Sequence, residues 1–444
     1  MSMSMSAPEE TVVSITPLLK RLWPTPANDK VTAQEIAAAI SHIFTNSLTP
    51  VQTGALLTAL HFTGLDGQPD VLSKCSQAMR NAAAQVDKRQ LRKVLKARKK
   101  QEGSYNGGLC DIVGTGGDSH NTFNISTTAS IIASTFLIIA KHGNRASTSK
   151  SGSADLLSNI TPKAPVLDNI RPDTLADIYS KSNYAFLFAP TFHPGMRYVI
   201  PIRKELGWRT IFNLMGPLSN PVDSTDRTSN SAKSASLIEA RMIGVARKDL
   251  GSAFAEAYVL SGARKGMVVC GDEDLDEISC AGPTHCWLIK ERPNPEYRGP
   301  LDTEGWEDTT SDDDGPPKTL ASIESFKLTP QDFGFPVHSL ASVGPGKEPQ
   351  ENAEIFRRIL SGEMDIDEPV MHFVLINTAA LLVVSGICDA DTSAMGPGDD
   401  GKINKEVGPG GGRWKEGVRR AKWAIQSGSA LKSLQNFIEA THSV

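Results

Sequence analysis

The sequence lacks the features that mark membrane spans, zinc sites and nucleic-acid binders. Only 6 of its 444 residues are cysteines, which excludes a disulfide scaffold, and no two of them have the close Cys-x-x-Cys spacing of a zinc site. The most apolar stretch, 131–140, is too short to cross a bilayer. With 46 Lys and Arg against 50 Asp and Glu the net charge is -4, so no overall positive field attracts nucleic acid.

The first residues also show no secretory leader pattern. Residues 1–9 alternate Met and Ser without a basic region or an apolar core, so we expect a soluble, cytoplasmic protein. The composition, 39% hydrophobic and 22% charged, is that of a globular protein. The length is ample for a large core divided into two lobes, preceded by a disordered tail over 1–11.

The segment 12–107 has helical signals and no strand pattern. Thr32 and Glu35 have the spacing of a capping box ahead of apolar residues at helical intervals. Pro50 follows Thr49 as in the first turn of a second helix, and 71–86 fits a third. We therefore predict a small all-helical N-terminal domain.

Lys and Arg are concentrated between residues 88 and 100, interleaved with apolar side chains such as Leu91 and Leu95. One interpretation is an anion-binding or nucleic-acid-binding patch. The other, which we favour, is an exposed amphipathic helix whose basic side chains lie over apolar surface.

From residue 108 short β-branched runs alternate with helical stretches, which predicts βαβ units. The fold class we expect is α/β, with the helical domain beside a larger α/β domain over 108–444 that has a central, largely parallel sheet. Segment 190–212 is expected to contribute to the helical domain. Predicted strands cover 109–113, 136–140, 184–188, 242–246 and 267–270. Three polar segments are interpreted as insertions that form surface loops, which can be partly disordered. They are a Ser-, Thr- and Asn-rich segment near 223–236, a segment with an acidic run and two adjacent prolines near 292–318, and a Gly-, Pro- and Asp-rich segment near 389–412.

A glycine-rich turn follows the first predicted strand, in the order Gly114-Thr-Gly-Gly-Asp118, and a helix is expected to open at Thr127 or Thr128. Glycines let a phosphate approach the backbone, and a helix N-terminus offers free N–H groups. The spacing fits neither the Walker A nor the dinucleotide fingerprint. A phosphate site and a simple capped turn are both compatible with this pattern.

A second strand–loop–helix unit favours the phosphate site. Lys141-His-Gly-Asn-Arg145 is followed by a run of hydroxyl residues up to Ser153. Loops at the carboxyl ends of neighbouring strands converge on one crevice in open α/β sheets. Lys141 and Arg145 can neutralise phosphate charge there.

Two further clusters are candidates for binding. Asp276 and Glu277 lie in an acidic loop just after a predicted strand, where adjacent carboxylates suit a hard cation such as Mg²⁺. Arg203, between Pro190 and Asn213, could hold a carboxylate with two hydrogen bonds. The alternatives are a solvated acidic turn and a surface ion pair of Arg203 with a neighbouring Glu.

The ordered set of motifs resembles the anthranilate phosphoribosyltransferase family of tryptophan biosynthesis. Besides the motifs above, the set includes Asn124-Ile-Ser-Thr127, Ser151-Gly-Ser-Ala-Asp155 and the run from Phe212 to Pro221. The resemblance runs from about residue 48 to 437, interrupted by the three insertions. It implies a homodimer that uses Mg²⁺ and phosphoribosyl pyrophosphate, with no membrane and no nucleic acid among its partners.

The resemblance also implies a role for individual residues. The phosphoribosyl donor would be held by Gly114, Gly117, Asp118, Thr122, Asn124, Ile125, Ser126, Thr127, Lys141, Asn144, Arg145, Ser149 and Ser153. Anthranilate would meet Gly114, His142, Asn144, Pro190, His193 and Arg203, and magnesium would be held by Ser126, Asp276 and Glu277.

No general acid or base is expected, because an aromatic amine is already a nucleophile. Asn144, Arg203 and His142 would act by positioning. Two other functions stay open at this point. One is a pyrimidine nucleoside phosphorylase-like enzyme, which would use inorganic phosphate; the other is a non-catalytic, nucleic-acid-binding relative of the same fold.

Overall fold

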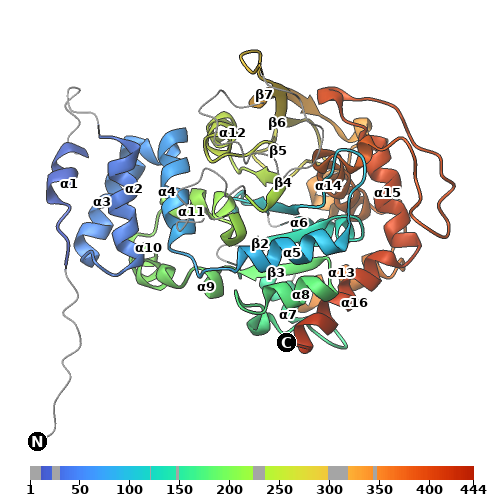
Figure 1. Cartoon of the computed structure of the whole chain (residues 1–444), viewed down its shortest axis with the longest axis horizontal. Helices are drawn as coiled ribbons and strands as arrows, with labels where there is room; N and C mark the ends of the chain where they lie inside the picture. The colour runs from blue at the N-terminus through green and yellow to red at the C-terminus, as the bar shows by residue number, and fades with distance from the viewer. Residues whose placement is uncertain are drawn as a thin grey trace, which may run out of the picture.

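The computed structural model describes residues 12–22, 31–120, 122–146, 150–223, 236–298, 319–343 and 348–444. The predicted tail 1–11 and most of the predicted loops 223–236 and 292–318 lie outside these residues. Figure 1 shows a bundle of N-terminal helices at one end of the molecule and the last helices of the chain at the other.

The N-terminal bundle contains α1 (Thr16–Leu22), α2 (Ala33–Phe44), α3 (Pro50–Thr63) and α4 (Pro69–Asn81). The predicted capping box is confirmed, since Thr32 and Glu35 hydrogen-bond each other's backbone at the start of α2. Thr49 caps α3, with Pro50 in the first turn as predicted. The helical pattern therefore places these helices correctly, although α4 ends before the predicted residue 86.

A later segment packs on this bundle. After β3 (Tyr184–Phe188) the chain forms α9 (Ala189–Phe192), α10 (Ile200–Leu206) and α11 (Ile211–Met215). Ile211 and Phe212 belong to the same apolar core as Ile40 and Leu56 of the bundle. Gly195 lies against α2, where an added Cβ would be 2.8 Å from the carbonyl oxygen of Phe44.

The sheet has seven strands in the order β3-β2-β1-β4-β5-β6-β7. The predicted largely parallel sheet is confirmed, because the five strands from β3 to β5 in this order pair in parallel. They are β1 (Leu109–Gly114), β2 (Ile138–Gly143), β3, β4 (Ile238–Gly244) and β5 (Gly266–Gly271). The antiparallel β6 (Thr284–Pro293) and β7 (Thr319–Leu328) are additional to the prediction. Most side chains of β7 are half-buried or exposed, and they form no continuous apolar run.

Two apolar cores cover the faces of the sheet. Ile112 and Met242 point into one core, which is formed with α6 (Ile125–Ala133), α8 (Leu175–Lys181), α14 (Pro369–Ser385), α15 (Trp414–Gln426) and α16 (Ser429–His442). Their neighbours Val113 and Ile243 point into the other, which continues through α12 (Gly251–Leu260) into the bundle. No helix within the described ranges has both the length and the apolar character needed to span a bilayer.

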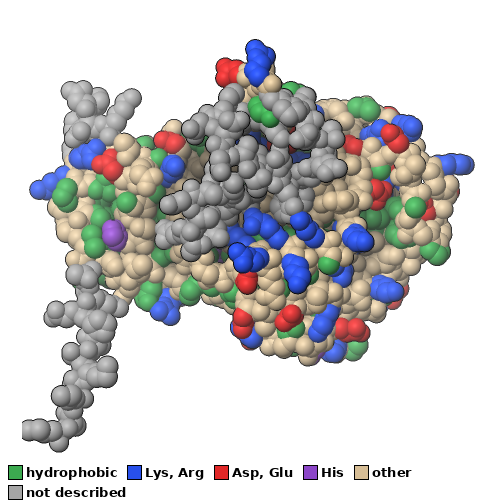
Figure 2. Space-filling model, in the orientation of Figure 1, with side chains coloured by type: hydrophobic (Ala, Val, Ile, Leu, Met, Phe, Trp, Pro, Cys, Tyr) green, Lys and Arg blue, Asp and Glu red, His purple; other side chains and the backbone are tan. Residues whose placement is uncertain are grey.

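The basic run forms α5 (Lys88–Arg98), which Asp87 caps. Leu91 and Leu95 are buried in the core of the α/β part, and Arg98 donates to the side chain of Asn183 at 2.5 Å. The Lys and Arg side chains gather on the outer face over this helix (Figure 2). The run is therefore an amphipathic helix, as predicted.

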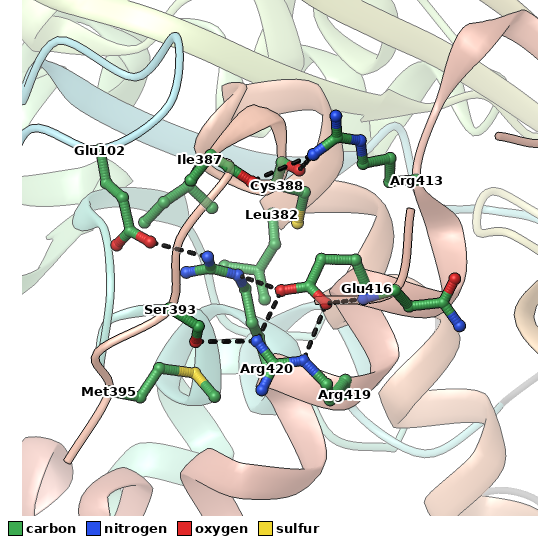
Figure 3. Close-up of polar contacts among 12 residues, drawn as sticks. Glu102, Leu382, Ile387, Cys388, Ser393, Met395, Arg413, Glu416, Arg419 and Arg420 are labelled. Carbon is green, nitrogen blue, oxygen red and sulfur yellow. Dashed lines mark hydrogen bonds and ion pairs between the residues drawn. The ribbon is translucent and has the colours of Figure 1, made fainter. Parts of the chain in front are cut away.

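The segment 389–412 is a long loop with one short 3₁₀ turn, Pro409–Gly411. The segment forms a surface loop, as predicted. All of its residues are described, and hydrogen bonds hold it against α15. Arg419 donates to Asp399 and to Ser393, each at 2.8 Å, and Glu416 accepts from the backbone of Asn404 at 3.0 Å. Figure 3 shows Arg419 between Glu416 and Ser393.

Candidate active site

The acidic loop after β5 folds over the carboxyl ends of β1 and β4. The backbone N–H of Gly116 donates to Oδ2 of Asp276 at 2.6 Å. A Cβ added to Gly114 would lie 2.3 Å from this Oδ2. A Cβ added to Gly244 would lie 1.6 Å from the backbone carbonyl oxygen of Asp276. Both strands therefore end in glycine because a side chain would displace the acidic loop.

Three carboxyl groups are crowded together at these strand ends. Desolvation, with Asp118 as the next cause, raises the pKa of Asp276 to about 7. Desolvation followed by the charge of Asp276 raises the pKa of Glu277 well above its ordinary value. Oε2 of Glu277 has no hydrogen-bond partner among the described residues. A cation placed here would stabilise the ionised carboxylates, so these side chains fit a hard metal ion.

The carboxylates do not form a closed metal cage by themselves. In the described part of the chain no three His, Cys, Asp or Glu side chains are grouped closely enough to hold an ion. This agrees with Mg²⁺ chemistry, because Mg²⁺ commonly takes only one or two carboxylates and completes its coordination with water and substrate phosphates.

The glycine-rich turn leads to the N-terminus of α6. Asn124 is the N-cap residue, and the helix begins at Ile125, earlier than the predicted Thr127 or Thr128. The backbone N–H of Ser126, in this first turn, donates to Glu277. The side chain of Ile125 is buried in the apolar core, so only its backbone can face a ligand.

The loop after β2 is built around one carboxylate. Asp155, in the first turn of α7 (Ser153–Ser158), accepts from the backbone of Ala146 at 2.8 Å and of Gly152 at 3.0 Å. Asp155 also forms an ion pair with Arg145 at 3.1 Å. Arg145, which we expected to face the donor phosphates, is therefore paired with a carboxylate of its own loop. Ser149 lies outside the described residues.

Hydrogen bonds join the two loops, which confirms the predicted convergence. The amide of Asn124 donates to the carbonyl of Ser151 at 2.9 Å, and the hydroxyl of Ser151 donates back to the Asn124 amide oxygen at 3.2 Å. The hydroxyls of Thr127 and Ser153 are 2.8 Å apart. The polar side chains predicted to hold the donor therefore come from two helix N-termini that lie side by side.

Lys141 and His142 lie at the end of β2, between these loops and the bundle. Lys141 is only 2% exposed, and the charges that face it belong to Asp111, Glu277 and Asp276. His142 lies 5.2 Å from His193, measured between ring centroids. Burial lowers the pKa of His142 well below its ordinary value and lowers that of His193 to about 4. Both imidazoles are therefore neutral near pH 7.

Arg203 provides a cation on the bundle side of the site. Its guanidinium lies 5.7 Å from the centre of the Phe212 ring, and Phe212 in turn packs edge-on against Phe44 of α2. Within the described residues Arg203 is not among the salt bridges, so the surface ion pair considered from the sequence is absent there. Pro190 is in the first turn of α9, on the chain segment that leads to His193.

Comparison with known proteins assigns the chain to a family. The model described as "Glycosyl transferase family, a/b domain" matches residues 106–298 and 317–431, and "Glycosyl transferase family, helical bundle domain" matches 16–83. The anthranilate phosphoribosyltransferase of Schizosaccharomyces pombe is 35% identical over 401 residues, which is 90% of each chain. The Saccharomyces cerevisiae protein of that name is 33% identical over 404 residues, 88% of this chain and 87% of its own. The chain belongs to the anthranilate phosphoribosyltransferase family.

Solved structures agree with this assignment. The anthranilate phosphoribosyltransferase from Saccharomyces cerevisiae, solved in complex with PRPP and Mg, superimposes with a TM-score of 0.71 at 28% identity, covering 96% of this chain and 97% of that one. The enzyme from Thermus thermophilus superimposes with a TM-score of 0.67 at 27% identity, covering 96% and 99%. The predicted two-part fold is therefore the fold of this family.

The sequence did not indicate the buried charges under the site. Asp111, within β1, accepts from the amide of Asn220 at 2.9 Å and lies 3.6 Å from Nε of Arg241. Arg241 also pairs with Asp223 at 3.1 Å. These residues come from distant parts of the chain. The only sequence feature that could have indicated such ion pairs is a charged residue, Asp111 or Arg241, within or next to an apolar strand. In this member of the anthranilate phosphoribosyltransferase family these charged residues support β2 at His142. The backbone N–H of His142 donates to Oδ1 of Asp111 at 3.3 Å.

Arg209 is a further residue that the sequence did not assign. It donates to the carbonyl oxygen of Gly116 at 3.4 Å, and its guanidinium lies 3.6 Å from where a Cβ on Gly117 would be. It therefore connects the segment after β3 to the glycine-rich turn.

We expect Gly244→Ala to push the acidic loop away from the strand ends, because the new methyl group would overlap the backbone of Asp276. Overpacking of this kind costs about 1–3 kcal/mol. Urea denaturation measures the loss. Gly282→Ala is the matched control, since nothing lies within 4 Å of its Cβ position. Equal stability of the two variants would contradict the close approach.

Proposed function

We propose that this protein transfers the 5-phosphoribosyl group from phosphoribosyl pyrophosphate to the amine of anthranilate, in the biosynthesis of tryptophan. The products are N-(5-phosphoribosyl)anthranilate and pyrophosphate. The observation that supports this most is the meeting, at one edge of the sheet, of the acidic loop with two polar helix N-termini. Membership of the family supports it independently.

We assign the donor to the polar side of the site. Its phosphates would take hydrogen bonds from the first turns of α6 and α7, through Asn124, Ser126, Thr127 and Ser153. Lys141 supplies a buried positive charge beside them. The hydroxyl pair of Thr127 and Ser153 is 2.8 Å apart, so both can turn toward one phosphate.

We assign Mg²⁺ to Asp276 and Glu277, together with Ser126. The crowded carboxylates are costly to ionise in the protein alone, and a divalent cation would offset their repulsion. When bound, the metal would neutralise charge on the pyrophosphate leaving group. Asp118 faces Asp276 and would help to place the donor.

We assign anthranilate to the side that faces the bundle. Arg203 would bind the carboxylate, and the neutral rings of His142 and His193 would form the wall against the aromatic ring. Nε2 of His142 has no partner in the described structure, so it can accept a hydrogen bond from the amine. Asn144 lies at the start of the second loop and would orient the same group.

The proposed reaction depends on aligning the amine nitrogen with the anomeric carbon more than on transferring a proton. The amine nitrogen forms a bond to the anomeric carbon while the bond from that carbon to pyrophosphate breaks, and one amine proton is then lost to water. The aromatic amine is already a nucleophile, so a general base is not required before attack. The residues named above act by holding the two reacting atoms in line and by stabilising the charge that develops on the leaving group.

A homodimer and a cytoplasmic location stay predictions of the sequence. The nucleic-acid alternative rests on the basic run of α5 alone, and membership of an enzyme family favours the transferase over it. A phosphorylase would need inorganic phosphate and a nucleoside as substrates.

The direct test of the proposed function is the loss of anthranilate fluorescence. We expect the signal to fall when the protein receives anthranilate, phosphoribosyl pyrophosphate and Mg²⁺ together, and to stay constant if any one is left out. Phosphorolysis of a pyrimidine nucleoside, with no anthranilate consumed, would favour the alternative enzyme.

The double variant Asp276→Asn, Glu277→Gln is expected to lower turnover at limiting Mg²⁺ while the protein stays folded. Losing a well-placed charge ligand costs on the order of 3 kcal/mol of barrier, roughly a hundredfold in rate. Asp274→Asn, on the same loop but exposed, is the control. Parent-like turnover of the double variant at limiting Mg²⁺ would remove the two carboxylates from the mechanism.

Arg203→Ala is expected to raise the KM for anthranilate about tenfold or more, with a smaller effect on the KM for the donor. The reason is the loss of a charged hydrogen bond to the carboxylate. Steady-state kinetics with Lys204→Ala as control separates this from a general charge effect, since Lys204 is exposed on the same helix. An unchanged KM for anthranilate would overturn the assignment.

A further inference from the structure

A cavity of about 410 Å³ lies at the other end of β2 from the candidate active site. Its walls come from the end of α5, the turn between α6 and β2, the loop 389–412, α15 and α16. Phe136 lines it just before β2 begins, whereas Lys141 and His142 stand at the opposite end of that strand. The cavity is thus separate from the site described above, and its volume suits a small molecule.

Three lysines give this cavity a positive lining. Lys99 and Lys100 directly follow α5, and Lys432 lies on α16. Nζ of Lys100 donates to the carbonyl oxygen of Thr135 at 3.1 Å. Lys99 and Lys432 are exposed, and no hydrogen bond or ion pair engages their ammonium groups in the part of the chain that is described. The acidic residue of the lining, Glu102, is already paired with Arg420 at 2.7 Å (Figure 3).

Two aromatic rings stand beside the lysines. The ring centroids of Phe136 and Trp423 are 5.9 Å apart, and the planes are inclined by 45°. The indole N–H of Trp423 donates to the carbonyl oxygen of Pro397 at 3.1 Å, which fixes the ring against the loop 389–412. Flat aromatic groups stack on such side chains, and every nucleic-acid base has a suitable face.

Hydroxyl and amide groups complete the lining. The side-chain oxygen of Thr135 is buried without a hydrogen-bond partner among the described residues. Ser433 and Asn436, both on α16, line the same cavity. These groups can donate to phosphate oxygens beside the lysines, and compact ammonium groups are common phosphate binders.

The wall contributed by the loop 389–412 is firmly attached. Met395 lines the cavity, and its backbone N–H donates to Asp399 at 2.9 Å. Asp399 is held in turn by Arg419 at 2.8 Å, and Arg419 pairs with the buried Glu416 (Figure 3). The cavity is therefore formed before any ligand binds, which reduces the entropy cost of binding.

We propose that this cavity is a binding site for a nucleotide. Its base would stack on Trp423 and Phe136, and its phosphate would meet Lys99, Lys100 and Lys432. The proposal gives a role to two features that the transferase reaction does not use, namely the basic end of α5 and the insertion 389–412. It does not depend on the proposed reaction.

Isothermal titration calorimetry with AMP tests the proposal on the full chain. We expect AMP to bind, and the double variant Lys99→Ala, Lys432→Ala to bind it at least tenfold more weakly. Lys163→Ala with Lys402→Ala is the matched control, because both lysines are exposed and lie outside the cavity lining. The control variant should keep the parent affinity, and both double variants should keep the parent melting temperature.

Three further titrations decide whether the site and the ligand class are right. AMP should still bind when phosphoribosyl pyrophosphate and Mg²⁺ are saturating; displacement of AMP would place it in the other site and overturn the proposal. Inorganic phosphate or indole-3-propionate binding as tightly as AMP would overturn the nucleotide assignment. Absence of AMP binding, or equal affinity in the two double variants, would overturn it as well.

Discussion

The crowding of carboxylates at the carboxyl ends of β1, β4 and β5 is the constraint on which the site depends. Asp276 is pressed against two strand ends that have no side chain, and Glu277 lies beside it. Like charges in a desolvated place repel each other and resist ionisation, so the arrangement is poor for stability alone. A bound cation with phosphate ligands would make it favourable, which is why we interpret it as a binding site.

Buried ion pairs beneath the strand ends and the loops beside them hold this arrangement in place. The pairs that Asp111 and Asp223 make with Arg241 neutralise buried charge under the site, and charge buried in pairs is tolerated where isolated charge is not. Hydrogen bonds between the two helix N-termini fix the spacing of the groups that we assign to the donor phosphates. The segment after β3 then brings Arg203 and His193 from the bundle side, where we assign the binding of anthranilate.

Much of this could be predicted from the sequence, since local signals and strand order carry it. The capping box at Thr32 and the strand at 184–188 are local patterns, and the convergence of the two loops follows from parallel pairing. The partners of buried charges, such as Arg241 with Asp111, could not be predicted, because they are distant in sequence. The roles of single residues toward ligands came from the family resemblance rather than from spacing. The hairpin of β6 and β7 was not predicted, because most side chains of its outer strand are half-buried or exposed and form no continuous apolar run.

We expect the donor and the metal to bind together. Calorimetric titration of the protein with phosphoribosyl pyrophosphate, in the presence and the absence of Mg²⁺, measures this directly. The predicted result is an affinity at least tenfold higher with Mg²⁺, because the cation relieves the repulsion among Asp118, Asp276 and Glu277 and that of the incoming phosphates. Equal affinity under both conditions would contradict the claim that the crowded carboxylates form the metal-dependent part of the site.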